Sequence, residues 1–192
     1  MAGKYEFRPD RQGSSLWKKL YMTPLQRARL FKWVLYGAVL VAASVIQDVV
    51  MSRFRVLDAT TDLVPCAIFL ICLAEGSETG GLFTLISAFA YLFSGTAPGF
   101  YCVPFLTILA ILVTIFRQAL LQKGFLASLL CTGAALLVYE LLVFAIGLFL
   151  ELTVFDRYLG FLLTTALTLI AIPILYPIVK FISTIGGEAW KD

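Results

Sequence analysis

The sequence contains no histidine, and only 14% of its residues are charged. Without an imidazole group, the chain lacks an essential part of Ser-His-Asp and Cys-His nucleophile systems, of Ser-His intramembrane proteases and of histidine-containing zinc sites. An intramembrane aspartyl protease would need two aspartates at bilayer depth, and only Asp48 comes near, close to the end of its apolar run. We therefore predict that the protein is not an enzyme.

Ligands for a metal ion are also few. The stretch "EGSETG" over 75–80 offers only two carboxylates, Glu75 and Glu78, which are too few for a divalent-cation site, so we expect a solvated turn. The four cysteines show no C-x-x-C spacing and lie in or beside apolar runs, as small buried hydrophobic residues do. They are Cys66, Cys72, Cys102 and Cys131. The sequence thus predicts no metal site, no disulfide and no cofactor.

Apolar residues, by contrast, are abundant. They make up 60% of the 192 residues, and the mean hydropathy is +0.93. An average soluble domain is far less apolar than this. The chain is long enough for about five or six membrane spans of about 20 residues, with no room for a second domain. Composition therefore predicts an integral protein of the lipid bilayer.

Positive charge gathers near the N-terminus. Eight of the fifteen Lys and Arg residues lie in residues 1–32, although the net charge is only +3. This clustering is typical of a cytoplasmic N-terminus, whereas nucleic-acid binding would need a basic surface patterned for phosphates. The basic part is too long for a cleavable signal, and no small-residue cleavage site follows a short apolar core. We predict no nucleic-acid partner.

Six apolar runs follow along the chain. They cover residues 31–50, 63–74, 81–93, 102–116, 124–150 and 158–182. As ideal helices, the second and third runs would cross only about 18 to 20 Å of a hydrocarbon core about 30 Å thick. Flanking residues nearly make up the difference, and a re-entrant hairpin is the alternative. We predict an all-α integral membrane protein, a compact six-transmembrane-helix bundle whose second and third helices are short.

The distribution of Lys and Arg predicts the orientation of this bundle. With the N-terminus inside, the inner segments carry twelve Lys and Arg residues and the outer loops carry three, in agreement with the positive-inside rule. We expect a basic cytoplasmic segment over 1–30, a six-helix membrane domain over 31–182 and a short cytoplasmic tail over 183–192. Residues 15–33 suit either an interfacial helix, interrupted at Pro24, or a plain basic anchor.

Glu140, in "LLVYELLVFA", is the one acid far from both ends of its run. An ionised carboxylate there would cost about 3 kcal/mol or more unless it faced a partner, a cavity or a proton. It should therefore point into the bundle or at another protein. Two roles are open: a structural hydrogen bond to Gln47, Tyr139 or a hydroxyl of another span, or contact with a ligand, a proton or a partner.

The order of several short motifs resembles the rod shape-determining protein MreD family over about residues 34–150. These motifs are "IQDVVMSRF", "TDLVP", "AEGSETGGLFTLISAFAYLFSGTAPG" and "LVTIFRQALLQKGFLASLLCT". Gln47 matches the glutamine that follows the family's first apolar run, and Asp62 matches the acid that opens its second span. The turn glycines and proline of the family correspond to Gly80 or Gly81, and to Gly95, Pro98 and Gly99.

Three positions depart from the family pattern and indicate a divergent branch. Thr61 stands where proline is frequent, Ala88 where glycine is frequent, and Tyr91 where aspartate is usual. The loss of that aspartate puts in doubt any function that depends on a polar group at this position.

The resemblance implies a non-enzymatic component of the machinery that elongates the lateral cell wall in a bacterial plasma membrane. Its implied partners are an MreC-like bitopic membrane protein and, through it, the RodA and transpeptidase elongation complex, with actin-like MreB filaments beneath the membrane. The small, loop-poor sequence independently suits a membrane scaffold that acts through its helix faces. The candidate contact residues are Gln47, Asp48, Asp62 and Glu140.

One alternative belongs to a different class, the substrate-binding S component of an energy-coupling-factor vitamin transporter, which is also a compact six-helix membrane protein. Fold alone does not separate the two functions. A vitamin pocket needs polar or aromatic groups that converge in the outer half of the bundle. The residues that could contribute are Gln47, Asp48, Tyr91, Tyr101 and Glu140.

Overall fold

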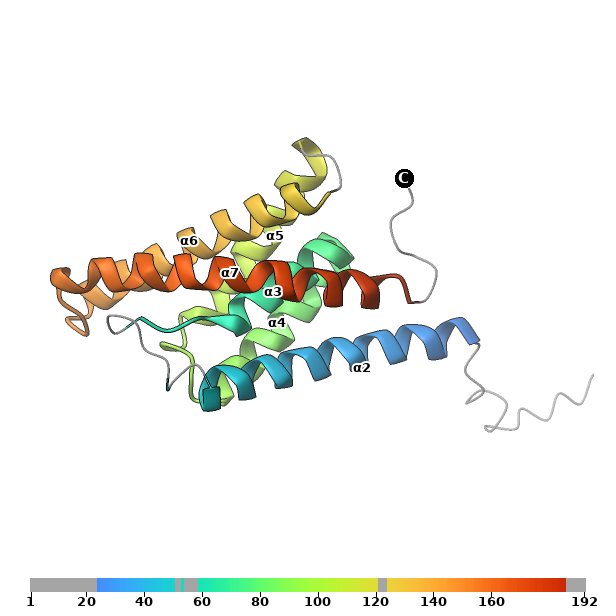
Figure 1. The fold of residues 1–192 in the computed structure, drawn as a ribbon, viewed down its shortest axis with the longest axis horizontal. Helices are drawn as coiled ribbons and strands as arrows, with labels where there is room; N and C mark the ends of the chain where they lie inside the picture. Colours follow the sequence, from blue (N-terminus) through green and yellow to red (C-terminus); the bar gives the residue numbers. More distant parts are fainter. Residues whose placement is uncertain (1–23, 51–52, 54–58, 121–123, 186–192) are drawn as a thin grey trace, which may run out of the picture.

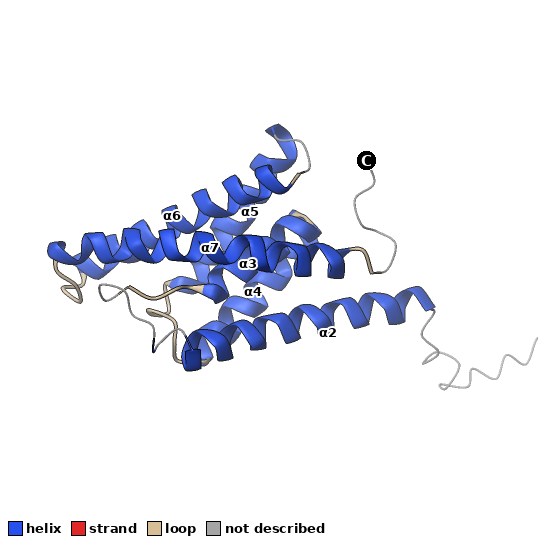
Figure 2. Cartoon of the chain, in the orientation of Figure 1, coloured by secondary structure: helices blue, strands red, loops and turns tan. Residues whose placement is uncertain are grey.

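The computed structural model describes residues 24–50, 53, 59–120 and 124–185. These residues form helices and loops without a β-strand (Figure 2). The helices are α2 (Pro24–Val45), which continues as the π-helical turn η1 (Ile46–Val50), α3 (Leu63–Glu75), α4 (Ser77–Phe93), α5 (Cys102–Leu120), α6 (Phe125–Phe149), the 3-10 turn η3 (Phe155–Arg157) and α7 (Tyr158–Ser183). Each of the six apolar runs lies in one of them.

Four helical segments are long and apolar enough to cross a membrane. They are Pro24–Val50, Cys102–Ala119, Phe125–Phe149 and Phe155–Ser183. The protein is therefore all-helical and, by the length and composition of these segments, a multi-pass membrane protein. The 13 residues of α3 and the 17 of α4 make them the shortest α-helices described. At 1.5 Å per residue they extend about 20 and 26 Å, less than the roughly 30 Å hydrocarbon core.

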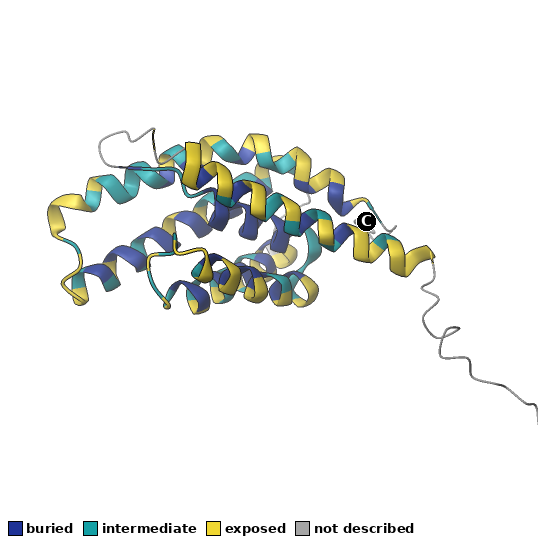
Figure 3. Ribbon diagram, turned by 90° about the horizontal axis from the view of Figure 1, so that it is seen from below, coloured by how far each residue is buried: buried dark blue, intermediate teal, exposed yellow. Residues whose placement is uncertain are grey.

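Helix α3 forms the centre of the structure. It packs against each of the other five α-helices, and eleven of its residues are buried. Figure 1 shows it between α2 and α6, and Figure 3 shows the exposed residues on the outer faces of the surrounding helices. A helix that is apolar on all sides requires such an enclosed position. The four cysteines are free thiols and are buried, as the sequence predicts.

The turn between α3 and α4 corrects the prediction for Gly80 and Gly81. Both residues lie inside α4, and the turn is made by Gly76, whose φ of +93° suits glycine. A Cβ at Gly80 would lie 2.8 Å from the carbonyl oxygen of Cys72, and a Cβ at Gly81 would lie 3.1 Å from Ile111 Cγ1. These glycines therefore allow the close approach of α3 and α5 to α4.

The connection between α4 and α5 holds the other predicted turn residues. Gly95 has a φ of +78°, and Pro98 and Gly99 lie in the same connection before Cys102 begins α5. The hydroxyl of Tyr101 donates a hydrogen bond to the Pro98 carbonyl at 3.0 Å. This hydrogen bond stabilises the connection between α4 and α5.

The first helix begins earlier than the sequence predicts. Its first residue is Pro24 rather than Phe31, so part of the expected basic segment is helical. Proline is well tolerated at the first helical position because its missing N–H would have no partner there, so Pro24 begins a helix instead of interrupting one. Residues 1–23 and 186–192 of the predicted terminal segments lie outside the described residues.

From α3 to α7 the helices run alternately between two ends of the bundle. We call one the Glu75 end, which contains the Gly76 turn, the start of α2 and the end of α7. The other is the Tyr91 end, which contains residues 94–101 and 150–157.

Glu75 lies inside this first end and not in a solvated turn, which corrects the sequence prediction. Its side chain is only 8% exposed, and its Oε2 lies 2.7 Å from Lys32 Nζ. The Tyr36 hydroxyl donates a hydrogen bond to Oε1 at 2.6 Å. Helix α2 carries both partners alongside the end of α3. Glu78, the other acid of the turn, is exposed.

The last turn of α3 receives a polar partner from another helix. Arg117 of α5 donates a hydrogen bond through Nη1 to the carbonyl of Leu73 at 2.8 Å. A cation at this position also interacts favourably with the negative end of the helix dipole. Arg117 is 5% exposed. The sequence assigns this residue to an inner loop, but its guanidinium reaches back into the bundle.

The Lys32–Glu75 pair yields a stability prediction. Lys32→Met should lower the free energy of unfolding in detergent by about 3 kcal/mol or more, because the Glu75 carboxylate would remain buried without its cation. Tyr36→Phe removes one hydrogen bond and should cost about 1 to 3 kcal/mol. Reversible denaturant unfolding of the purified protein measures both values.

Glu78→Gln is the matched control, since its exposed site predicts a change within about 0.5 kcal/mol. Equal stability of Lys32→Met and the unchanged protein would contradict a stabilising role for the pair.

Candidate functional site

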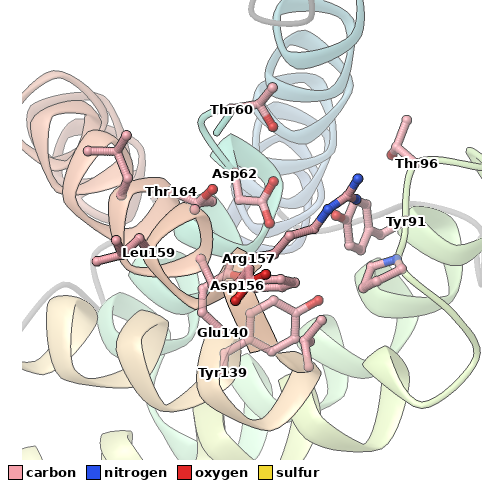
Figure 4. A pocket seen from close by; sticks show the side chains of 15 residues that line it. Thr60, Asp62, Tyr91, Thr96, Tyr139, Glu140, Asp156, Arg157, Leu159 and Thr164 are labelled. Atoms are coloured by element: carbon pink, nitrogen blue, oxygen red, sulfur yellow. The ribbon is translucent and has the colours of Figure 1, made fainter. Parts of the chain in front are cut away.

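A cavity of about 540 Å³ lies at the Tyr91 end (Figure 4). Its walls come from the residues before α3, the end of α4, the turn that follows α4, the second half of α6, η3 and the start of α7. Small-molecule sites in proteins have volumes of about 300 to 1,000 Å³. The charged and phenolic residues that line it are Asp62, Tyr91, Tyr139, Glu140, Asp156 and Arg157.

Asp62 and Glu140 form a pair of carboxyl groups in this cavity. The two groups interact electrostatically and lie close together, and both line the cavity (Figure 4). Two ionised carboxylates at close range repel one another, so this arrangement favours a proton on one of them. Glu140 is only 5% exposed, so it does not face lipid.

The start of α3 places Asp62 at the cavity. The backbone N–H of Asp62 donates to Thr168 Oγ1 of α7 at 2.9 Å, and the N–H of Val64 donates to Gln47 Oε1 at 3.1 Å. The first N–H groups of a helix have no partner within the helix, and here no side chain of α3 itself caps them. Two distant elements, α7 and η1, supply the acceptors instead.

Gln47 reaches α3 from the π-helical turn η1. The turn lies at the end of α2, and Gln47 is its one buried residue. The side chain also lies close to the Tyr91 hydroxyl. Gln47 thus connects the start of α3 to the end of α4, directly beside the cavity.

Tyr91 and Tyr139 supply aromatic rings to the wall. Tyr91 is 2% exposed and lies near both carboxyl groups. Its hydroxyl therefore places a polar group at this position. Tyr139 is fully buried, and its ring contacts Phe69 of α3 edge to face, with 6.4 Å between ring centroids.

Two polar atoms on the cavity wall have no protein partner among the described residues. They are the Oε1 atom of Glu140 and the hydroxyl of Tyr139. Leaving a buried donor or acceptor unpaired costs about 1 to 3 kcal/mol, so such atoms in a native protein usually serve a purpose. Both belong to residues that line the cavity.

Of the predicted contact residues, the structure brings three together. Asp62 and Glu140 line the cavity, and Gln47 lies behind them. Asp48 is exposed and does not line the cavity. Of the two tyrosines that the transporter alternative requires, Tyr91 lines it, and Tyr101 packs instead against neighbouring residues of its own turn.

Sequence reasoning missed Asp156 and Arg157 as parts of this site. Both belong to η3 and line the cavity. The signal was present in the sequence as an adjacent acid and base directly before the last apolar run. We interpreted Arg157 only as an outer-loop charge.

The cavity residues offer groups that can bind a small molecule. Within the ranges that the structure describes, no group of three or more Cys, Asp or Glu residues is placed to hold a metal ion. The paired carboxyl groups and the unpartnered hydroxyl can exchange hydrogen bonds and protons with a ligand. No protein-family model, no curated protein and no solved structure matches this chain.

The carboxyl pair yields a prediction for Glu140. Glu140→Leu should lower the free energy of unfolding by about 1 to 3 kcal/mol, because Asp62 would lose its polar neighbour inside the protein. Glu140→Gln retains shape and hydrogen-bonding ability and should change stability by less than about 1 kcal/mol. Thermal and denaturant unfolding in detergent provide the measurement.

Asp62→Asn, alone and combined with Glu140→Leu, completes a double-mutant cycle. A coupling energy of about 0.5 to 3 kcal/mol is expected for side chains in contact. Additive effects, or a neutral Glu140→Leu, would show that the pair does not stabilise the bundle.

Proposed function

We propose that this chain is a non-enzymatic scaffold of the bacterial machinery that elongates the cell wall, related to the rod shape-determining protein MreD family. In this role its helix faces contact an MreC-like bitopic membrane protein and, through it, the RodA and transpeptidase complex. The bundle resides in the plasma membrane. The observation that carries the proposal is that Gln47, Asp62 and the turn residues Gly95, Pro98 and Gly99 lie at one end of the bundle, whereas Gly80 and Gly81 lie at the other.

The motif residues at the Tyr91 end are separated in the sequence, yet their side chains meet. Gln47 holds the start of α3 and contacts Tyr91, Asp62 precedes α3, and Pro98 lines the cavity together with Asp62 and Tyr91. Motif positions that gather at one place in a fold are expected to serve one function. The residues whose order resembles the MreD family thus also lie near one another in the structure.

The exposed helix faces also suit a scaffold. Helix α2 has the least buried apolar window of the four long segments, at 11%. Large apolar side chains project from it, including Val34, Val41 and Val45, each more than half exposed. Membrane helices associate through such faces by van der Waals packing, so α2 has room for a partner helix beside the lipid.

We also propose six spans with both termini in the cytoplasm. Among the described residues, the Glu75 end carries five basic residues, and the Tyr91 end carries two. The first group is Arg27, Arg29, Lys32, Arg117 and Lys180, and the second is Arg53 and Arg157. Under the positive-inside rule this difference supports a cytoplasmic Glu75 end and an outward Tyr91 end.

Cysteine labelling tests this orientation. In a variant whose native cysteines are replaced, single cysteines at Thr60 and Thr96 should react with an impermeant thiol reagent added to intact cells. A cysteine at Thr79 should react only after the cells are permeabilised, because it lies at the Glu75 end. The reverse labelling pattern would invert the topology.

A second function is favoured by one observation, the cavity itself. Its volume of about 540 Å³ and its polar groups at the Tyr91 end are features that the S component of a vitamin transporter would need. The two functions predict different defects in a cell from which the protein is removed.

Depletion of the protein in a rod-shaped bacterium that carries it should cause rounding and delocalised wall synthesis, because the scaffold would no longer hold the elongation complex together. Microscopy with a fluorescent wall precursor measures both effects. Added vitamins should not restore the shape, whereas the protein expressed from a second copy should. Recovery of growth and shape on vitamins alone would exclude the scaffold role and favour the transporter.

A further inference from the structure

Acidic residues outnumber basic residues around the cavity. Its charged lining residues are Asp62, Glu140, Asp156 and Arg157. The charge of Asp156 offsets that of Arg157, which leaves the two carboxyl groups of Asp62 and Glu140. No ion pair joins Arg157 to Asp62 or Glu140 in the described part of the chain. The lining therefore has an excess of acidic groups over basic ones.

The unpartnered atoms define what a ligand must offer. Glu140 lines the cavity, and its buried Oε1 is a carboxyl oxygen without a donor among the described residues. Tyr139 has its unpartnered hydroxyl on the preceding residue of α6. A ligand that pairs with both must present N–H or O–H groups close together. Because acidic groups predominate in the lining, a cationic N–H group would form the stronger, charge-assisted hydrogen bonds.

The rest of the wall suits an organic cation better than a bare metal ion. The rings of Tyr91 and Tyr139 flank the carboxyl pair in Figure 4. A cation within about 6 Å of an aromatic face is attracted to it. Apolar side chains complete the wall at Val143, Leu159 and Phe161, where they could contact the carbon body of a ligand.

We propose that this cavity is a binding site for a small organic cation, whose ammonium or amidinium group hydrogen-bonds to Glu140 and Tyr139 beside Asp62. The apolar body of the ligand lies between α6 and α7. This inference goes beyond the scaffold role. Its test uses the isolated protein, so failure of either proposal leaves the other standing.

The test compares two ligands of the same shape and different charge. Benzamidinium has a flat ring and a cationic donor group, and benzamide is its neutral counterpart. Isothermal titration calorimetry and thermal shift are measured on the full chain in lipid nanodiscs. Benzamidinium should bind with a dissociation constant of about 10 mM or lower, as expected for a ligand of about nine heavy atoms that fits its site. Benzamide should bind about tenfold more weakly or not at all.

Two variants locate the binding. Glu140→Gln removes the charge and should weaken benzamidinium binding by about tenfold or more, whereas Glu78→Gln, the same change at an exposed site, should leave it unaltered. Gly160→Leu should block the cavity, because Gly160 lines it and an added Cβ there meets no atom within 4 Å. Gly37→Leu is its control, at a site outside the cavity with equal free space.

The Gly160→Leu result tests the location even if Glu140→Gln does not fold. Absence of benzamidinium binding at about 10 mM would overturn the proposal. Equal binding of benzamidinium and benzamide would overturn it as well, as would binding that survives both Glu140→Gln and Gly160→Leu.

Discussion

The enclosure of α3 by the other five α-helices is the constraint on which the rest of the structure depends. This helix is too short to carry its ends to both faces of a bilayer, and it is buried almost throughout. A helix leaves its first N–H groups and last C=O groups unpaired, and in a membrane interior water does not pair them. Other helices therefore have to provide polar side chains at both of its ends.

The two ends meet this requirement differently. At the Glu75 end, Arg117 bonds to the last turn of α3, and Lys32 and Tyr36 hold Glu75. These contacts join α2 and α5 to the central helix. In this polar cluster Lys32 neutralises Glu75, and Arg117 interacts with the negative end of the α3 dipole.

At the Tyr91 end the polar groups exceed what α3 requires. Gln47 and Thr168 already satisfy its first N–H groups. Glu140 and Tyr139 of α6 add a carboxyl oxygen and a hydroxyl that no described residue pairs. Native proteins keep few such atoms in their interiors, since each lowers the stability of the fold. Their position on residues that line the larger cavity is the reason that the binding proposal concerns this end.

The sequence by itself determined the membrane class, the six apolar runs and the inward direction of Glu140. These follow from local quantities: the length of each apolar run, and the cost of placing a charge in hydrocarbon. The tertiary structure alone decided that Asp62 pairs with Glu140 and Lys32 with Glu75. It also decided that Gly80 and Gly81 serve helix contact and not a turn. Such contacts join residues far apart in the chain, so they depend on how each helix is rotated and packed against its neighbours, which the pattern along one helix does not specify.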